Sequence, residues 1–142
     1  GEQVGAQPAA AAAIDGAEIA ALIARTRQVA IDDAILTGVR DLVRSTRPED
    51  ELCPAQIKPA IWYGAGPRAG LSLISMARAL ALVERSEAVR WAHIRRMAKP
   101  VLRHRVRLTA QGGRDGMDED TLVDDLLTRL EERQKNLAKG IA

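Results

Sequence analysis

Apolar residues recur at the spacing of one helix face along most of the chain. The clearest case lies between residues 32 and 48, where the apolar positions are Ile35, Leu36, Val39, Leu42 and Val43. Polar and charged residues occupy most positions between them, so the pattern predicts an amphipathic helix. Asp32 or Asp33 is suited to begin this helix, and Pro48 ends it.

The helix before it is predicted from a capping pattern. Asp15 is suited to act as its N-cap, and Glu18, three residues later, completes an arrangement of the capping-box kind. One apolar stripe follows, made of Ile19, Leu22 and Ile23. Residues 1–13 are rich in alanine and lack amphipathic alternation, so we interpret them as a linker or disordered lead-in and residues 14–142 as the domain.

Two further helices are expected downstream. Pro67 suits the first position of a helix that runs to Glu84 and is apolar on most sides, as in the central helix of a bundle. A fourth helix is expected over residues 91–98, with a turn or short helix after Pro100. The sequence QGGRDG that follows is expected to be a loop.

A last helix begins near Asp118, with acidic residues in its first half and lysines at its end, as the helix dipole favours. Residues 47–66 form an irregular connection that holds a single helical turn within PAQIKPAIWYG. Together these elements predict an all-α fold, a compact bundle of about five helices. The chain is 46% hydrophobic but has no Phe, so the core must be aliphatic.

Composition narrows the class of protein further. A single cysteine, Cys53, cannot form an intramolecular disulfide and fits a reducing compartment. No apolar run reaches the roughly 20 residues that a membrane span needs. The first residues lack the basic region of a signal peptide, so we expect a cytoplasmic protein. Because the chain begins at Gly1 rather than at a methionine, we interpret it as a segment of a longer protein.

The candidate chemistry lies in the sequence GAGPR at the start of the third helix. Gly64 and Gly66 allow unusual backbone conformations and a close approach of a ligand, and Pro67 fixes the entry into the helix. Arg68 then adds a guanidinium, which matches phosphate, to a helix start that already favours anions. The alternative is a helix start whose arginine pairs with a surface carboxylate.

Two motifs carry a resemblance to a known family. WYGAGPRAGLSLISMARALAL, followed by MAKPVLRHRVRL, is similar to the C-terminal lid of the MoxR family of AAA+ ATPases. The likeness runs from about Glu18, through LVRSTRP, to TLVDDLLTRLEE, and so covers most of the chain. One departure concerns the start of the fourth helix, where residues 90–93 replace the family's hydroxyl, proline and acids. This helix start is therefore expected to be looser or differently capped.

The resemblance implies a role for each residue of the loop. Arg68 takes the place of the sensor 2 arginine, which reaches the γ-phosphate of ATP, and Gly64, Gly66 and Pro67 belong to the same nucleotide-facing segment. ATP and Mg²⁺ would be held mainly by a preceding α/β domain. The G-x-x-x-x-G-K-[ST] loop is missing here, so we expect neither hydrolysis nor a bound cofactor from this chain alone.

The resemblance also implies partners. They are the upstream AAA+ core domain, neighbouring subunits of a ring expected to be a hexamer, and protein substrates, among them proteins with a von Willebrand factor A domain. The activity implied is a chaperone-like remodelling or assembly of protein complexes.

Residues 85–107 form a basic segment with one acid, Glu87, and suggest a second hypothesis. A freestanding helical module could use this segment to bind nucleic acid or an acidic protein. Nucleic acid is disfavoured because only Trp91 could stack on bases, and Arg103, His104 and Arg105 are instead candidates for an interface. No metal site is expected, because the two histidines are too far apart. The aromatic residues are interpreted as packing anchors; they are Trp62, Tyr63 and Trp91. Trp62 and Tyr63 are expected to fix the loop that presents Arg68.

Overall fold

The all-α prediction is confirmed by the computed structural model, which describes residues 14–138. The predicted lead-in of residues 1–13 and the last four residues lie outside this part of the chain. The described part holds six helices, which are α1 (Gly16–Gln28), α2 (Asp33–Ser45), α3 (Pro67–Val83), α4 (Trp91–Leu102), α5 (Ala110–Arg114) and α6 (Glu119–Ala138).

The helix starts follow the predicted caps. The side chain of Asp15 accepts a hydrogen bond from the backbone of Glu18, and the side chain of Glu18 accepts one from the backbone of Asp15. Asp32 accepts from the backbone of Ala34 at the start of α2, and Asp118 accepts from the backbone of Thr121 at the start of α6. Each contact satisfies an N–H group that the helix itself leaves free.

Three predictions of local structure were wrong. Helix α4 does not stop near residue 98 but continues through Pro100 to Leu102. Its last turn buries Val101 and Leu102, and this burial offsets the backbone hydrogen bond that the proline removes. The sequence QGGRDG is not only a loop, because Thr109 caps the short helix α5 there. With α5, residues 14–138 hold six α-helices, in keeping with the predicted bundle of about five.

The third correction is a small antiparallel sheet in which β1 (Ile61–Tyr63) pairs with β2 (Arg107–Leu108). The expected single helical turn in the preceding segment is present as a 3₁₀ helix, η1 (Lys58–Ala60). Helix α5 packs on η1, and a side chain at Gly112 would meet the backbone of Ala60 at 2.8 Å. These contacts close the connection between α2 and α3 against the segment between α4 and α6.

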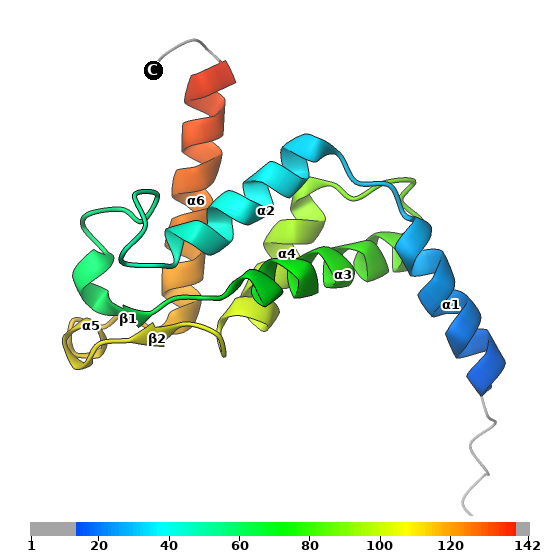
Figure 1. Ribbon diagram of the computed structural model, residues 1–142, viewed down its shortest axis with the longest axis horizontal. Coiled ribbons are helices and arrows are strands. Elements are labelled where there is room, and N and C mark those ends of the chain that lie inside the picture. Colours follow the sequence, from blue (N-terminus) through cyan, green and yellow to red (C-terminus); the bar gives the residue numbers. More distant parts are fainter. Residues whose placement is uncertain (1–13, 139–142) are drawn as a thin grey trace, which may run out of the picture.

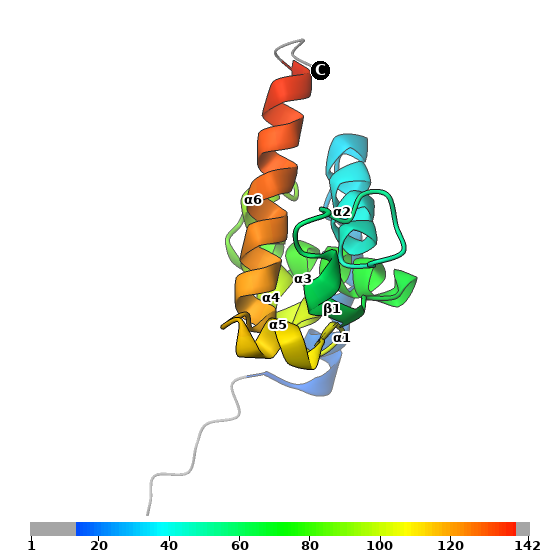
Figure 2. The same ribbon diagram turned by 90° about the vertical axis from the view of Figure 1, so that its left-hand side faces the viewer.

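Helix α3 takes the central position that its apolar sequence predicts. It contacts α4, α2 and α1, while α6 contacts α4 and α2 (Figure 1). Figure 2 shows α6 beside the other helices, with its C-terminal end extending beyond them. The core between them is aliphatic, and its largest fully buried side chains are Leu42, Leu73, Ile94, Leu102, Leu122, Leu126 and Leu127.

Helix α1 differs from the other long helices because it buries none of its residues. It adjoins the C-terminal end of α3 and extends away from the bundle (Figure 1). Its apolar stripe, made of Ile19, Leu22 and Ile23, remains exposed. The periodicity thus predicted the helix correctly, although this stripe does not enter the core.

Trp91 links three helices and is a packing anchor, as predicted. Its ring lies against Gly38 of α2, where a Cβ atom would be 2.8 Å from the ring. Its Nε1 donates a hydrogen bond of 2.8 Å to the carboxylate of Glu131 on α6. The same carboxylate oxygen accepts a hydrogen bond from Arg95 at 2.7 Å. Partial burial raises the pKa of Glu131, but the hydrogen bonds from Trp91 and Arg95 outweigh it and leave the pKa below its usual range.

We expect Glu131→Gln to destabilise the fold by about 1 kcal/mol at pH 7, since the carboxylate is only partly exposed. A depressed folded-state pKa contributes stability above the ordinary value of 4.5, and this is lost as the pH falls through the folded-state value. The difference between the variant and the wild type should therefore shrink below about pH 4.5. Urea unfolding at pH 7 and pH 3.5 measures it. Glu132→Gln, at an exposed neighbouring position, should show no such difference.

Candidate functional site

The loop before α3 is held by the C-terminal end of α2. Thr46 is fully buried, and its hydroxyl donates to the carbonyl of Val43 at 2.7 Å. The same hydroxyl oxygen accepts a hydrogen bond from the N–H of Ala65 at 2.9 Å. Nε of Arg47 donates to the carbonyl of Ala65 at 2.9 Å. Both polar backbone groups of Ala65 are therefore bound to side chains that follow α2.

Gly64 is required by packing, a reason that its sequence context does not reveal. A Cβ atom there would lie 2.4 Å from the carbonyl oxygen of Thr46 and 2.8 Å from Cα of Arg47. Its backbone is not in the left-handed region. Glycine is thus required here by the close approach of the loop to α2 and not by an unusual backbone conformation. Gly66, in contrast, has open space around it.

Helix α3 begins immediately after this loop. Gly66 is its N-cap residue and offers no side-chain cap, and Pro67 occupies the first helical position as predicted. Arg68 follows in the first turn and is exposed. Among the described residues no carboxylate pairs with Arg68, so the alternative of a surface ion pair finds no support there.

Two of the expected packing anchors do not pack. Trp62 is 75% exposed and Tyr63 is 63% exposed, whereas Ile61 before them is buried. The aromatic pair lies on strand β1, whose hydrogen bonds to β2 hold the segment instead of aromatic burial. The function predicted for Trp62 and Tyr63, fixing the loop that presents Arg68, is carried out by Thr46 and Arg47.

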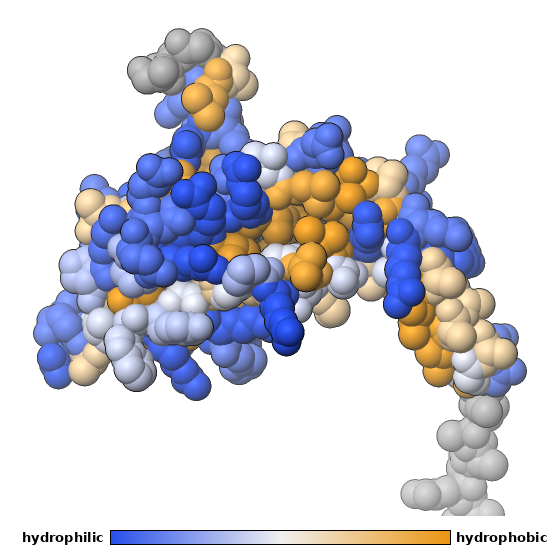
Figure 3. Space-filling model, in the orientation of Figure 1, coloured by the Kyte–Doolittle hydropathy of each residue, from blue (hydrophilic) through white to orange (hydrophobic). Residues whose placement is uncertain are grey.

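An apolar groove of about 260 Å³ runs between α2 and α3 and reaches Pro67. Its apolar lining comes from both helices and includes Leu36, Val39, Val43, Leu71 and Ile74. Figure 3 shows this apolar surface over α2 and α3, with hydrophilic side chains gathered on one side of it. Three arginines of the groove come from α2 and the residues after it; they are Arg40, Arg44 and Arg47. Arg68 thus stands beside a groove that combines apolar and cationic groups.

The segment after α2 is tied back to the helix by charge. Nε of Arg44 donates to Asp50 at 2.8 Å, and a second nitrogen of Arg44 donates to Glu51 at 3.2 Å. The contact with Asp50 raises the pKa of Arg44, and the same contact lowers the pKa of Asp50. Arg44 is therefore occupied by these carboxylates, whereas Arg47 turns to the loop.

The three interface candidates make different contacts. Arg103 pairs with Asp120 at 2.8 Å, and exposed His104 borders a shallow hollow beside the start of α6. Arg105 donates to the carbonyl of Val101 at 2.6 Å and lies 3.4 Å from the hydroxyl of Ser72 on α3. That hydroxyl also donates to the carbonyl of Arg68, so Arg105, but not Arg103, lies next to the turn that carries Arg68.

Much of the basic segment forms ion pairs within the molecule. Four of its side chains pair with carboxylates of α6 or of residue 84; the pairs are Arg95–Glu131, Arg96–Glu84, Lys99–Asp124 and Arg103–Asp120. These pairs leave fewer free cations for a phosphate backbone, and nothing in the described residues favours the nucleic-acid hypothesis.

The expected change of cap at the fourth helix is confirmed. His93 is buried, and its Nδ1 accepts a hydrogen bond of 2.9 Å from the N–H of Arg90. Its Nε2 lies 3.1 Å from the carboxylate of Glu84. The histidine thus replaces the acid that would reach back to the N-cap residue.

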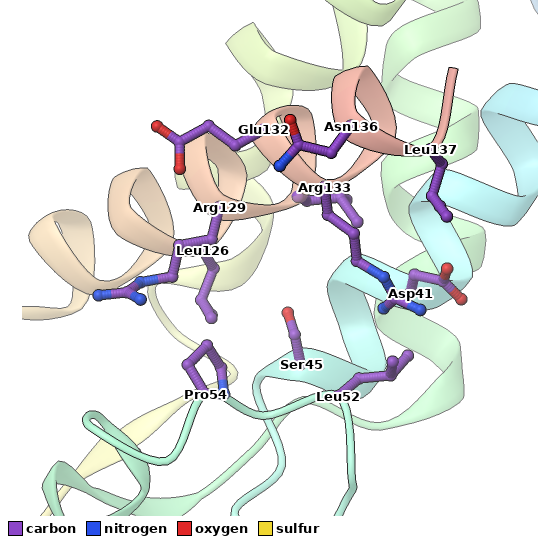
Figure 4. Close-up of a pocket in the computed structure, with 11 residues that line it drawn as sticks. Asp41, Ser45, Leu52, Pro54, Leu126, Arg129, Glu132, Arg133, Asn136 and Leu137 are labelled. Atoms are coloured by element: carbon purple, nitrogen blue, oxygen red, sulfur yellow. The ribbon is translucent and has the colours of Figure 1, made fainter. Parts of the chain in front are cut away.

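A larger hollow lies elsewhere, between the end of α6, the end of α2 and the loop at Leu52 and Pro54 (Figure 4). Its volume is about 530 Å³, and its lining mixes polar and apolar side chains. It is open to solvent and does not include Arg68. Residues 14–138 also contain no group of three or more potential metal ligands. We therefore place the candidate site at Arg68.

Comparisons with known proteins identify the fold. A family model described as the AAA lid domain matches residues 55–126, which include the loop, α3, α4 and the start of α6. This chain belongs to the AAA lid domain family. The chaperone MoxR1 of Mycobacterium tuberculosis is 31% identical over 97 residues, which cover 68% of this chain and 26% of MoxR1. The predicted resemblance to a MoxR-like AAA+ lid is therefore confirmed.

A solved structure of a proposed ATPase from Cytophaga hutchinsonii is also similar to this AAA lid domain. Its TM-score is 0.69 at 26% sequence identity, and the match covers 78% of this chain and 33% of the other. The AAA lid domain thus spans about a quarter to a third of the length of these two proteins. In the part of the chain that the structure describes, no helix is both long enough and apolar enough to cross a membrane.

Proposed function

We propose that this lid completes the nucleotide site of a MoxR-type AAA+ ATPase and that Arg68 is its sensor for the γ-phosphate of ATP. The observation that carries the proposal is the position of Arg68, exposed at a helix start and unpaired within residues 14–138. Arg68 is exposed at the start of a long helix and has no carboxylate partner among the described residues. It follows a loop in which both the N–H and the carbonyl of Ala65 are hydrogen-bonded. A cation at a helix start is suited to bind phosphate.

In this proposal the ATP and Mg²⁺ are held mainly by a core domain that precedes the lid. The lid closes over the nucleotide, and Arg68 contacts the terminal phosphate in the closed state. Nucleotide shifts the lid angle because it binds the closed state more tightly than the open one. Neighbouring subunits of a ring, expected to be a hexamer, transmit the movement to protein substrates, for which proteins with a von Willebrand factor A domain are candidates. The residues that carry this coupling to ring neighbours would include His104 and Arg105, which are exposed.

The first test is the Arg68→Ala variant of the full-length protein. Its ATP turnover should fall about tenfold or more, because a cation that stabilises the charge of the transferring phosphoryl group is removed. Arg68→Lys should recover part of the rate, since it keeps the charge but loses the planar fork of donors. Steady-state ATP hydrolysis measures both variants.

Arg25→Ala is the matched control, because Arg25 is an exposed arginine of α1. Helix α1 adjoins the end of α3 that is farther from Arg68 (Figure 1). Its turnover should equal that of the wild type. The melting temperature of Arg68→Ala should also be unchanged. Wild-type turnover of Arg68→Ala would contradict the proposal, and a sharp fall in melting temperature would show that Arg68 is structural.

A further inference from the structure

We propose that Thr46 is the positioning residue for Arg68, acting through a clamp on the backbone of Ala65. The inference rests on the proposed function, because it takes Arg68 as the group that contacts phosphate. It adds a residue at the end of another helix, which forms hydrogen bonds with Val43 and Ala65 and not with Arg68.

The clamp depends on one hydroxyl with two hydrogen bonds. Thr46 donates to the carbonyl of Val43, which directs the lone pairs of its oxygen toward the N–H of Ala65. The side chain is fully buried, so water cannot replace the contact if the hydroxyl is lost. Arg47 binds the carbonyl of the same residue, but Arg47 is only partly buried and its contact is open to exchange with solvent. The hydrogen bond from Ala65 to Thr46 is therefore the more persistent of the two contacts that fix Ala65.

The chain between the clamp and Arg68 is short and stiff. Only Gly66 and Pro67 separate Ala65 from Arg68, and proline fixes one backbone dihedral angle. Behind Arg68, Ala69 is buried and its N–H donates to the carbonyl of Gly66 at 2.9 Å. A shift of Ala65 relative to α2 must therefore move the first turn of α3. The position of Arg68 is thus set from α2, across a gap of about 20 residues in sequence.

The experiment compares three variants of the full-length protein. Thr46→Val keeps the shape of the side chain but removes the hydroxyl, and Thr46→Ser keeps the hydroxyl. Ser45→Ala is the matched control, because the buried hydroxyl of Ser45 donates to the carbonyl of Leu42 and does not contact the loop. Thr46→Val should lower kcat for ATP about tenfold, since small displacements of a charged group are costly in catalysis. Thr46→Ser and Ser45→Ala should stay within twofold of the wild type, and KM should change little in all three.

A double variant separates positioning from general destabilisation. Adding Thr46→Val to Arg68→Ala should cause no further loss of kcat, because Thr46 acts only through Arg68. A further tenfold loss would overturn the inference. Wild-type kcat in Thr46→Val, together with a lowered kcat in Arg68→Ala, would also overturn the inference. The proposed function of Arg68 would then survive. If Arg68→Ala itself keeps wild-type turnover, both are overturned.

A measurement without nucleotide tests the clamp by itself. In the chain described here, the N–H of Ala65 should exchange with solvent deuterium about tenfold faster in Thr46→Val than in Thr46→Ser, as measured by NMR. The amide of Ala77, a fully buried residue farther along α3, should be unchanged in both variants. Equal protection of Ala65 in the two variants would overturn the inference, whatever the turnover shows.

Discussion

Gly64→Ala is expected to destabilise the fold by about 3 kcal/mol, because its methyl group has no space. The added Cβ would lie 2.4 Å from the carbonyl oxygen of Thr46, and its other close neighbours are also backbone atoms of Thr46 and Arg47, which directly follow α2. Backbone atoms at a helix end cannot rotate away as a flexible side chain can. The loop must instead separate from α2, which breaks the hydrogen bonds of Thr46 and Arg47 to Ala65.

Gly66→Ala is the matched control for this prediction. Gly66 belongs to the same loop, has no atom within 4 Å of the added Cβ, and has a φ of −83° that alanine adopts freely. Its effect should stay below about 0.5 kcal/mol. Urea unfolding followed by circular dichroism gives both values. Equal stabilities of the two variants would contradict the close approach of the loop to α2.

Leu73→Ala is expected to cost about 3 kcal/mol through the cavity it leaves in the core. Leu73 is fully buried in the middle of α3, the helix that contacts α1, α2 and α4. Neighbouring helices cannot collapse onto the space without losing their other contacts. The free energy of unfolding from urea titration measures the effect.

Leu71→Ala removes the same atoms from the same helix but from an exposed side. Leu71 is 67% exposed, so its truncation should change stability by less than about 0.5 kcal/mol. Comparing the two variants isolates the effect of burial, because both replace leucine by alanine in the same helix and so change the helix propensity equally. Comparable losses at the two positions would show that α3 is not packed as described.

Local patterns in the sequence were sufficient for most helices. The capping residues Asp15 and Asp32, and Pro67 at the first position of α3, depend on neighbours three residues away or fewer, and all three are confirmed. The continuation of α4 through Pro100 was missed because local preference opposes it. There the burial of the last turn outweighs the preference.

The parts that the sequence did not predict depend on contacts between distant residues. Ile61 pairs with Leu108, and Thr46 binds Ala65, and no local spacing reports either contact. The GAGPR motif correctly located the start of α3 and an exposed Arg68, but the role of Gly64 could not be deduced. A glycine that approaches a ligand and one that approaches another helix look the same in a single sequence. The phosphate-sensing role of Arg68 itself stays a prediction.

The clamp also limits how the GAGPRA sequence could be transplanted by protein engineers. Copied alone onto another helical scaffold, the hexapeptide would keep its helix-starting proline but lose the surface that holds Ala65. A working graft would need a second helix followed directly by Thr-Arg, placed so that the carbonyl of this threonine meets the glycine of the loop. The smallest transferable unit is therefore the end of one helix together with the start of another, and the loop sequence describes only the second of these.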